Sequence, residues 1–170
     1  KKLIPFLIVI IIVSCFKNSE GLKQRDVPQI INRFLLLHVQ FNKFNDEISK
    51  RTLANYLYIL DYGKFYFYKS DIDTFKKYET KIDDLVKQNN FSFVFEIFAT
   101  YKNRFEANMK LLKKLLKKNY NFNRDEKIII DREKRKYASN QKEMYENWRK
   151  HVKLQLLNYT STGKSLKEAK

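Results

Sequence analysis

The chain is poor in the residues that build turns, cross-links and metal sites. Its 170 residues include three glycines, two prolines, two histidines and one cysteine. One cysteine cannot form a disulfide within the chain, and His38 and His151 have no metal-ligand neighbour at helical spacing. The sequence also has no glycine-rich loop for phosphate and no serine in a Gly-x-Ser-x-Gly turn. We therefore expect no catalytic, cofactor-binding or metal-binding residue in this chain.

Apolar and aromatic residues, in contrast, are plentiful. They make up 44% and 15% of the sequence, which argues against disorder and provides for a folded core. Because glycine and proline are scarce, the chain has little turn chemistry and is expected to form mostly long helices. The length is typical of one domain after a short N-terminal leader.

The net charge is +16, carried by 27 Lys and 8 Arg. Such an excess suggests nucleic acid, but base reading and bidentate phosphate binding favour arginine over lysine. We therefore expect no nucleic-acid partner. Two other interpretations of the lysines stay open, namely attraction to anionic lipid or cell-wall polymers and a merely solvated basic surface.

The N-terminus has the three-part layout of an export signal. Lys1 and Lys2 precede an apolar run from Leu3 to Val13, which is shorter than the roughly 20 residues of a membrane-spanning helix. The run ends in Ser14 and Cys15, an arrangement typical of a bacterial lipoprotein signal. We predict a signal peptide at 1–14, a lipid on Cys15, and a polar tether at 15–25. The alternative is an unmodified cysteine in a core segment of a cytosolic protein.

This signal predicts a place in the bacterial cell envelope, facing the periplasm. The residue after Cys15 does not distinguish the inner from the outer membrane.

Apolar residues recur at helical spacing in five segments, which predicts an all-α bundle of about five helices. Four helix starts carry capping residues. They are Asp26 with Pro28, Asn45, Ser70 with Asp73, and Ser139–Asn140 with Glu143. The helix that starts at Ser70 is expected to continue to Asn89. The longest helix, from Ser92 to Lys118, is expected to bury the stripe Val94, Phe98, Tyr101, Phe105, Met109, Leu112 and Leu116.

Residues 119–132 are the least helical part, with one short extended segment expected near 120–131 around Ile128–Ile130. Ser165 and Glu168 form a further capping box, which predicts the start of a sixth helix. Because few residues follow and no initiator methionine is present, we interpret the chain as a fragment that ends inside this helix.

Two carboxylate pairs, Asp71 with Asp73 and Asp83 with Asp84, have a spacing that acid–base catalysis could use. Their places at a helix start and on a charged helix face favour caps and solvated charges instead.

One block, Tyr56–Phe75, goes beyond periodicity. It resembles the N-terminal helical domain of bacterial tail-specific proteases, the C-terminal processing peptidases. That family shows a Leu-Asp-Pro turn, a basic residue, Tyr-Phe, and Ser-Asp-Ile before an aromatic residue. Three further stretches support the resemblance. They are Phe95–Phe98 with Tyr101 and Arg104, Ile130–Lys134, and Trp148–Lys153 with Leu156–Leu157. Tyr62 stands in place of the family's proline, and Ala138 stands near a frequent tryptophan.

The resemblance covers roughly residues 28–170 and implies what the whole protein contains. Family members join this helical domain to a PDZ domain and to a serine peptidase domain with a Ser/Lys pair that cleaves proteins. None of those catalytic residues falls within this chain. The implied partners of residues 26–170 are the PDZ and peptidase domains of the same chain, protein substrates, and a membrane through the lipid anchor.

The implied function is a non-catalytic scaffold of a periplasmic protease. A stand-alone helical surface lipoprotein that acts as a binding module is the alternative.

Overall fold

The computed structural model describes residues 23–37, 43–163 and 165–169. The predicted signal peptide, Cys15 and His38 lie outside these ranges. The described residues form helices and no strands, which confirms the all-α class. None of these helices is both long and apolar enough to cross a bilayer. The elements are η1 (Gln24–Asp26), α2 (Val27–Leu36), α3 (Asp46–Leu60), α4 (Lys69–Phe75), η2 (Lys76–Tyr78), α5 (Ile82–Lys87), α6 (Ser92–Leu116), α7 (Gln141–Ser161) and α8 (Leu166–Ala169).

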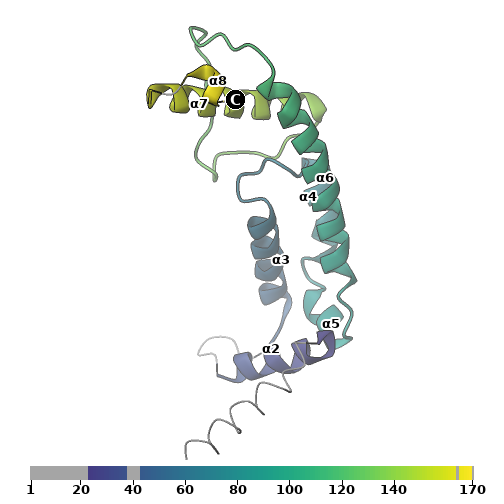
Figure 1. Ribbon diagram of the computed structural model, residues 1–170. Coiled ribbons are helices and arrows are strands. Elements are labelled where there is room, and N and C mark those ends of the chain that lie inside the picture. Colours follow the sequence, from purple (N-terminus) through teal and green to yellow (C-terminus); the bar gives the residue numbers. More distant parts are fainter. Residues whose placement is uncertain (1–22, 38–42, 164, 170) are drawn as a thin grey trace, which may run out of the picture.

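The helices form an elongated body rather than a compact ball (Figure 1). Helices α3 and α6 run along its long axis, and the Tyr56 hydroxyl of α3 donates to the Val94 carbonyl of α6 at 3.1 Å. Helix α2 crosses one end of the body beside α5, while α7 crosses the C-terminal end of α6 and carries α8 (Figure 1).

The apolar residues divide into two core clusters along this axis. The α3–α6 cluster contains Leu53, Leu57, Phe67, Phe75, Ile82, Val86, Phe93 and Ile97. The α6–α7 cluster contains Leu115, Ala138, Met144, Trp148, Val152 and Leu156. Because α6 contributes to both clusters, it joins the two halves of the domain.

Most helix starts are those that the sequence predicts. The Asn45 side chain accepts from the Ile48 N–H at 3.1 Å, and the Asn140 side chain accepts from the Glu143 N–H at 3.0 Å. The Glu143 carboxylate in turn accepts from the Ser139 N–H at 2.7 Å, which completes the predicted capping box. Asp26 occupies the N-cap position of α2, with Pro28 in the first turn, but its carboxylate accepts the Lys23 N–H at 3.0 Å and makes no cap bond to α2. Ser165 and Glu168 bond reciprocally.

The predicted cap at Ser70 is wrong. Helix α4 begins at Lys69 after Tyr68, and Asp71 rather than Asp73 accepts the Tyr68 N–H, at 2.9 Å. The start is displaced because Tyr68 pairs in an isolated parallel β-bridge with Ala138, whose carbonyl accepts the Lys69 N–H at 2.9 Å. Sequence spacing contains no sign of this distant partner.

The helix predicted from Ser70 to Asn89 is also interrupted. The chain forms α4, then the short η2, then a turn, then α5. Phe75 and Ile82, on either side of the interruption, are 2% and 1% exposed and belong to the same cluster. The break lets both side chains enter the α3–α6 cluster. Asn89 ends the region with a φ of 54°, in the left-handed conformation that asparagine tolerates.

The predicted stripe of α6 is confirmed in part. Five of its residues are partly buried and pack against the two clusters, namely Val94, Tyr101, Met109, Leu112 and Leu116. The fully buried side chains of α6 are instead Phe93, Ile97, Asn108 and Leu115, and the predicted Phe98 and Phe105 are 49% and 37% exposed. Apolar residues occupy two adjacent faces of α6, and periodicity alone cannot decide which face the neighbouring helices cover. On the second face of α6, the Tyr101 and Phe105 rings pack against Tyr66 from the turn after α3, with ring centroids 5.5 Å apart in each pair.

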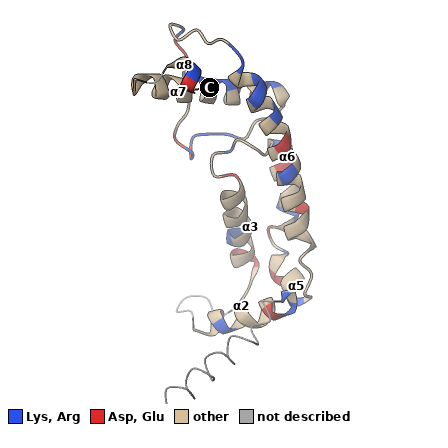
Figure 2. Ribbon diagram, viewed as in Figure 1, with Lys and Arg blue, Asp and Glu red and all other residues tan. Residues whose placement is uncertain are grey.

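Between α6 and α7 the chain runs through a long irregular segment, 117–140, which confirms 119–132 as the least helical part. No helix and no strand occurs within it, so the short extended segment expected near 120–131 does not form a strand. Figure 2 shows basic residues at the C-terminal end of α6 and again within this segment. The segment returns to the middle of the domain and there meets the turn that follows α3.

Candidate functional site

The turn after α3, residues 61–68, is organised around a buried carboxylate, and we call it the Asp61 loop. Asp61 is 1% exposed and accepts the backbone N–H groups of Phe65, Tyr66 and Phe67 at 2.7, 2.9 and 2.9 Å. Burial raises the pKa of Asp61, and these three donors together with Arg132 only partly offset that effect. One side chain therefore determines the path of the whole loop.

Lys64 holds the loop by its backbone and by its side chain. Its φ of 54° lies in the left-handed region, which costs a lysine of order 1 kcal/mol or more. Its ammonium group donates to the carbonyls of Arg132 and Arg135 at 3.1 and 2.8 Å. The strained residue thus ties the loop to the irregular segment.

The irregular segment binds back to the loop through two arginines. Arg132 Nε donates to the Tyr62 carbonyl at 2.7 Å, and Arg135 Nη1 donates to the Gly63 carbonyl at 2.8 Å. The Arg135 guanidinium lies 4.2 Å from the Phe65 ring centroid. Burial lowers the pKa of the Arg135 guanidinium, and the negative charge of Asp61 partly offsets this effect. Both arginines are therefore committed to structure.

Helix α7 completes this junction with Trp148. The indole N–H donates to the Phe65 carbonyl at 3.0 Å, and the Trp148 ring packs against Phe65 and Tyr66 with centroids 5.2 and 5.9 Å apart. His151, one turn later, lies 4.6 Å from the Phe65 ring. Burial and then the charge of Arg135 lower the pKa of His151, whose ring packs against Phe65 and Trp148.

A charged cluster fastens the start of the irregular segment to α7. Glu126 accepts from both Nη atoms of Arg149 and, at 2.8 Å, from the Lys153 ammonium group. Arg149 also bonds Glu146 at 3.0 Å, and Lys153 donates to the Arg124 carbonyl at 2.9 Å. The bonds from Arg149 and Lys153 lower the pKa of Glu126 to about 2.

The carboxylate pairs have structural roles that differ in part from the prediction. Asp71 caps α4, as expected of a cap, but it is buried and accepts two bonds of 2.9 Å from Arg104. Asp83 is 4% exposed rather than solvated. It accepts from the Ser49 hydroxyl at 2.9 Å and donates its own N–H back to that oxygen at 3.0 Å. Asp73 is exposed and pairs with nearby lysines.

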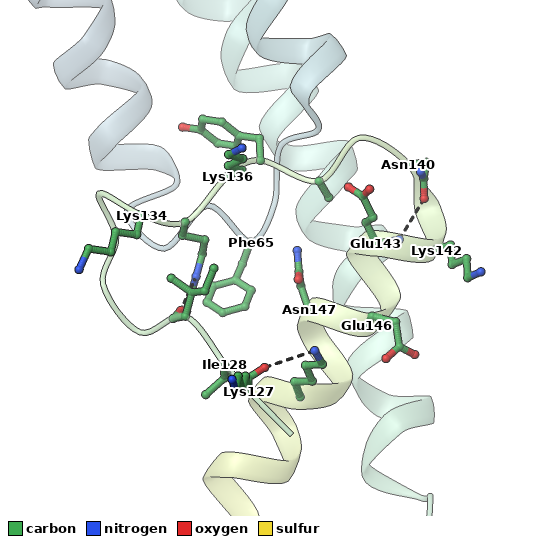
Figure 3. A pocket seen from close by; sticks show the side chains of 15 residues that line it. Phe65, Lys127, Ile128, Lys134, Lys136, Asn140, Lys142, Glu143, Glu146 and Asn147 are labelled. Atoms are coloured by element: carbon green, nitrogen blue, oxygen red, sulfur yellow. Dashed lines mark hydrogen bonds between the residues drawn. The ribbon is translucent and has the colours of Figure 1, made fainter. Parts of the chain in front are cut away.

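Beside the junction lies an open groove of about 680 Å³, between the irregular segment and the N-terminal half of α7. Figure 3 shows the Phe65 ring on its floor and the Asn147 side chain aimed into it from α7. Lys127 and Lys136 lie at opposite ends, with Ile128 beside Lys127. A groove of this size is in the range of ligand sites.

Of the predicted site residues, Cys15 and His38 lie outside the described residues, and His151 packs on Phe65. Within ranges 23–37, 43–163 and 165–169, no group of three or more His, Cys, Asp or Glu side chains is placed to hold a metal. Sequence reasoning missed the Asp61 loop, the Glu126 cluster and the groove. The aspartate before a run of aromatic residues was the only available signal for the first of these.

Fold and site together define an all-helical domain whose parts are locked at one polar junction and which has an open basic groove beside it. The sequence matches the family described as the tail-specific protease N-terminal domain over residues 30–170. The chain therefore belongs to this family.

A curated relative, the tail-specific protease of Haemophilus influenzae, is 31% identical over 135 residues, which cover 78% of this chain and 19% of the relative. The chain thus spans about a fifth of the length of that relative.

The stretches that carry the likeness meet in space. The Asp61 loop, the arginines of residues 130–135 and Trp148 of α7 contact one another directly. The two departures from the family pattern are compatible with this junction. The Tyr62 carbonyl accepts a hydrogen bond from Arg132, and a proline at this position would offer the same carbonyl. Ala138 is buried and pairs with Tyr68 in the β-bridge.

Proposed function

We propose that this domain is the scaffold of a tail-specific serine protease, supporting a PDZ domain and a Ser/Lys peptidase domain and helping to shape substrate access. Membership of the tail-specific protease N-terminal family is the observation that carries this proposal. The junction described above supports it, because loop, irregular segment and α7 are held by interlocked hydrogen bonds that suit a rigid platform. The cleavage chemistry would belong to other parts of the protein.

The gene beyond Lys170 provides the first test. We expect it to encode a PDZ-like segment and a catalytic serine. A stop codon directly after this region would instead favour a stand-alone binding module.

The second test compares the complete gene product with residues 1–170 alone, using an unstructured protein as substrate. We expect the complete product to degrade the substrate and residues 1–170 to leave it intact. Turnover by residues 1–170 that persists through repeated purification would refute the scaffold role.

We further propose that the protein is a lipoprotein of the bacterial cell envelope that faces the periplasm. The basic, apolar and Ser-Cys sequence of residues 1–15 supports this, with Cys15 as the lipid-bearing residue. Labelled fatty acid should enter the wild-type protein in a bacterial host and should be absent from Cys15→Ala. Incorporation into Cys15→Ala at the wild-type level would show that Cys15 is not the modified residue.

A further inference from the structure

The groove beside the Asp61 loop has unbalanced charge. Its lining includes the cations Lys127, Lys136 and Lys142, none of which makes an ion pair within the described part of the chain. The two carboxylates of the lining bind other groups and not these lysines. Glu143 caps α7, and Glu146 bonds Arg149 at 2.9 Å. The groove therefore presents positive charge without a partner.

The walls of the groove combine this charge with groups that suit a peptide. The Phe65 ring provides an apolar floor, and Ile128 and Ile129 provide an apolar side. The Asn147 amide, which can both donate and accept, is aimed into the groove and has no hydrogen-bond partner among the described residues (Figure 3). An extended peptide offers N–H and C=O groups to such an amide and apolar side chains to such walls.

The arginine of the groove argues against a phosphate polymer. Bidentate recognition of phosphate uses a free guanidinium. Arg135 instead donates to the Gly63 carbonyl at 2.8 Å and through Nε to the Ile129 carbonyl at 3.1 Å. The cations that remain free are lysines, which act as point charges and pair readily with carboxylates.

We propose that this groove binds an extended acidic peptide segment of a client protein, with carboxylates at Lys127 and Lys136 and an apolar side chain over Phe65. This goes beyond the scaffold role, because it assigns a binding activity to the domain itself. A binding measurement that needs no peptidase domain can test this proposal separately from the scaffold role.

The test measures fluorescence anisotropy of a labelled peptide that alternates Glu or Asp with Leu or Phe, added to the full chain at about 0.15 M salt, where screening limits the reach of distant charges to about 8 Å. A second peptide carries Gln and Asn in place of Glu and Asp. The variant Lys127→Glu/Lys136→Glu reverses the two groove charges. The control Lys113→Glu/Lys114→Glu makes the same change in net charge on exposed residues of α6, away from the groove lining.

We expect the acidic peptide to bind and the neutral peptide to bind at least about tenfold more weakly. The groove variant should weaken binding of the acidic peptide by about tenfold, and the control variant by less than about twofold, since exposed ion pairs act over short range. Circular dichroism checks that both variants keep the helical content of the wild type.

Three results would overturn the proposal. They are equal losses in the two variants, equal binding of the two peptides, and no binding up to about 1 mM peptide. A single-stranded oligonucleotide of matched charge serves as a competitor. If it binds as tightly as the peptide and responds equally to both variants, the surface is a general polyanion binder and the peptide groove is refuted.

Discussion

Replacement of Glu126 by glutamine tests whether the cluster on α7 stabilises the domain. The Glu126 and Lys153 side chains are each 11% exposed, and that of Arg149 is 19% exposed. The substitution Glu126→Gln keeps the shape of the side chain but removes its charge. Lys153 would then face a neutral amide, and Arg149 would keep Glu146 as its one carboxylate partner among the described residues, a situation that is costly in partly buried sites.

The magnitude follows from the pKa. The Arg149 and Lys153 bonds lower the pKa of Glu126 from 4.5 to about 2. At about 1.4 kcal/mol per pKa unit this corresponds to roughly 3 kcal/mol. Solvent reaches the edge of the cluster and screens it, so we expect Glu126→Gln to reduce the free energy of unfolding by about 2 kcal/mol at neutral pH.

The dependence on pH has a defined sign. The pKa of Glu126 is lower in the folded protein than in the unfolded chain, so its stabilisation is complete above about pH 4.5 and is lost as the pH falls towards about 2. The difference in stability between wild type and Glu126→Gln should therefore be constant from about pH 7 to 5 and shrink towards zero near pH 2.

Urea unfolding followed by the fluorescence of Trp148, the one tryptophan of the chain, measures this difference at each pH. Glu133→Gln is the matched control, because Glu133 also pairs with an arginine but its side chain is 81% exposed. That change should cost less than about 0.5 kcal/mol. Equal effects of the two substitutions at neutral pH, or a Glu126→Gln effect that does not vary down to about pH 2, would refute the reasoning.

Substitutions at three further positions test the Asp61 loop and the α3–α5 contact by the same urea unfolding. Asp61→Asn should cost about 2 kcal/mol, because one of the oxygens that accept the three loop N–H groups is lost; a cost under about 0.5 kcal/mol would contradict this role. Lys64→Ala should destabilise more than Lys64→Gly, since both lose the two carbonyl contacts but glycine relieves the strain at a φ of 54°; the reverse order would contradict the strain. Ser49→Ala should cost about 1–2 kcal/mol because the Asp83 N–H loses its buried acceptor, and an unchanged unfolding midpoint would contradict that bond.

The predictable part of the fold is the part governed by local interactions. Asn45 and Asn140 cap α3 and α7 as their spacing indicates, because a cap is satisfied within three residues along the chain. Ser70 fails as a cap because the bridge between Tyr68 and Ala138 starts α4 earlier. That bridge joins residues far apart in sequence, which no local pattern contains.

The exposed residues of the predicted α6 stripe and the missed site have a related cause. The exposed Phe98 and the buried Ile97 are neighbours in sequence, and only the position of α3 and α4 decides which of them enters the core. From the local sequence, Asp61 is predicted only to end a helix. Its three N–H donors are identified only in the folded loop, where the backbone curves around its carboxylate. Glu126 likewise acquires its role from Arg149 and Lys153, which lie on α7.

The bonds that hold the domain together and the side chains that line the groove belong to separate sets of residues. Asp61, Arg132 and Trp148 hold the junction through hydrogen bonds with backbone groups. Lys127 and Asn147 line the open side of the groove, and their side chains take no part in those bonds. The junction therefore does not depend on the side chains that are proposed to bind a peptide. Exchange of the groove residues should accordingly change binding while the fold stays intact.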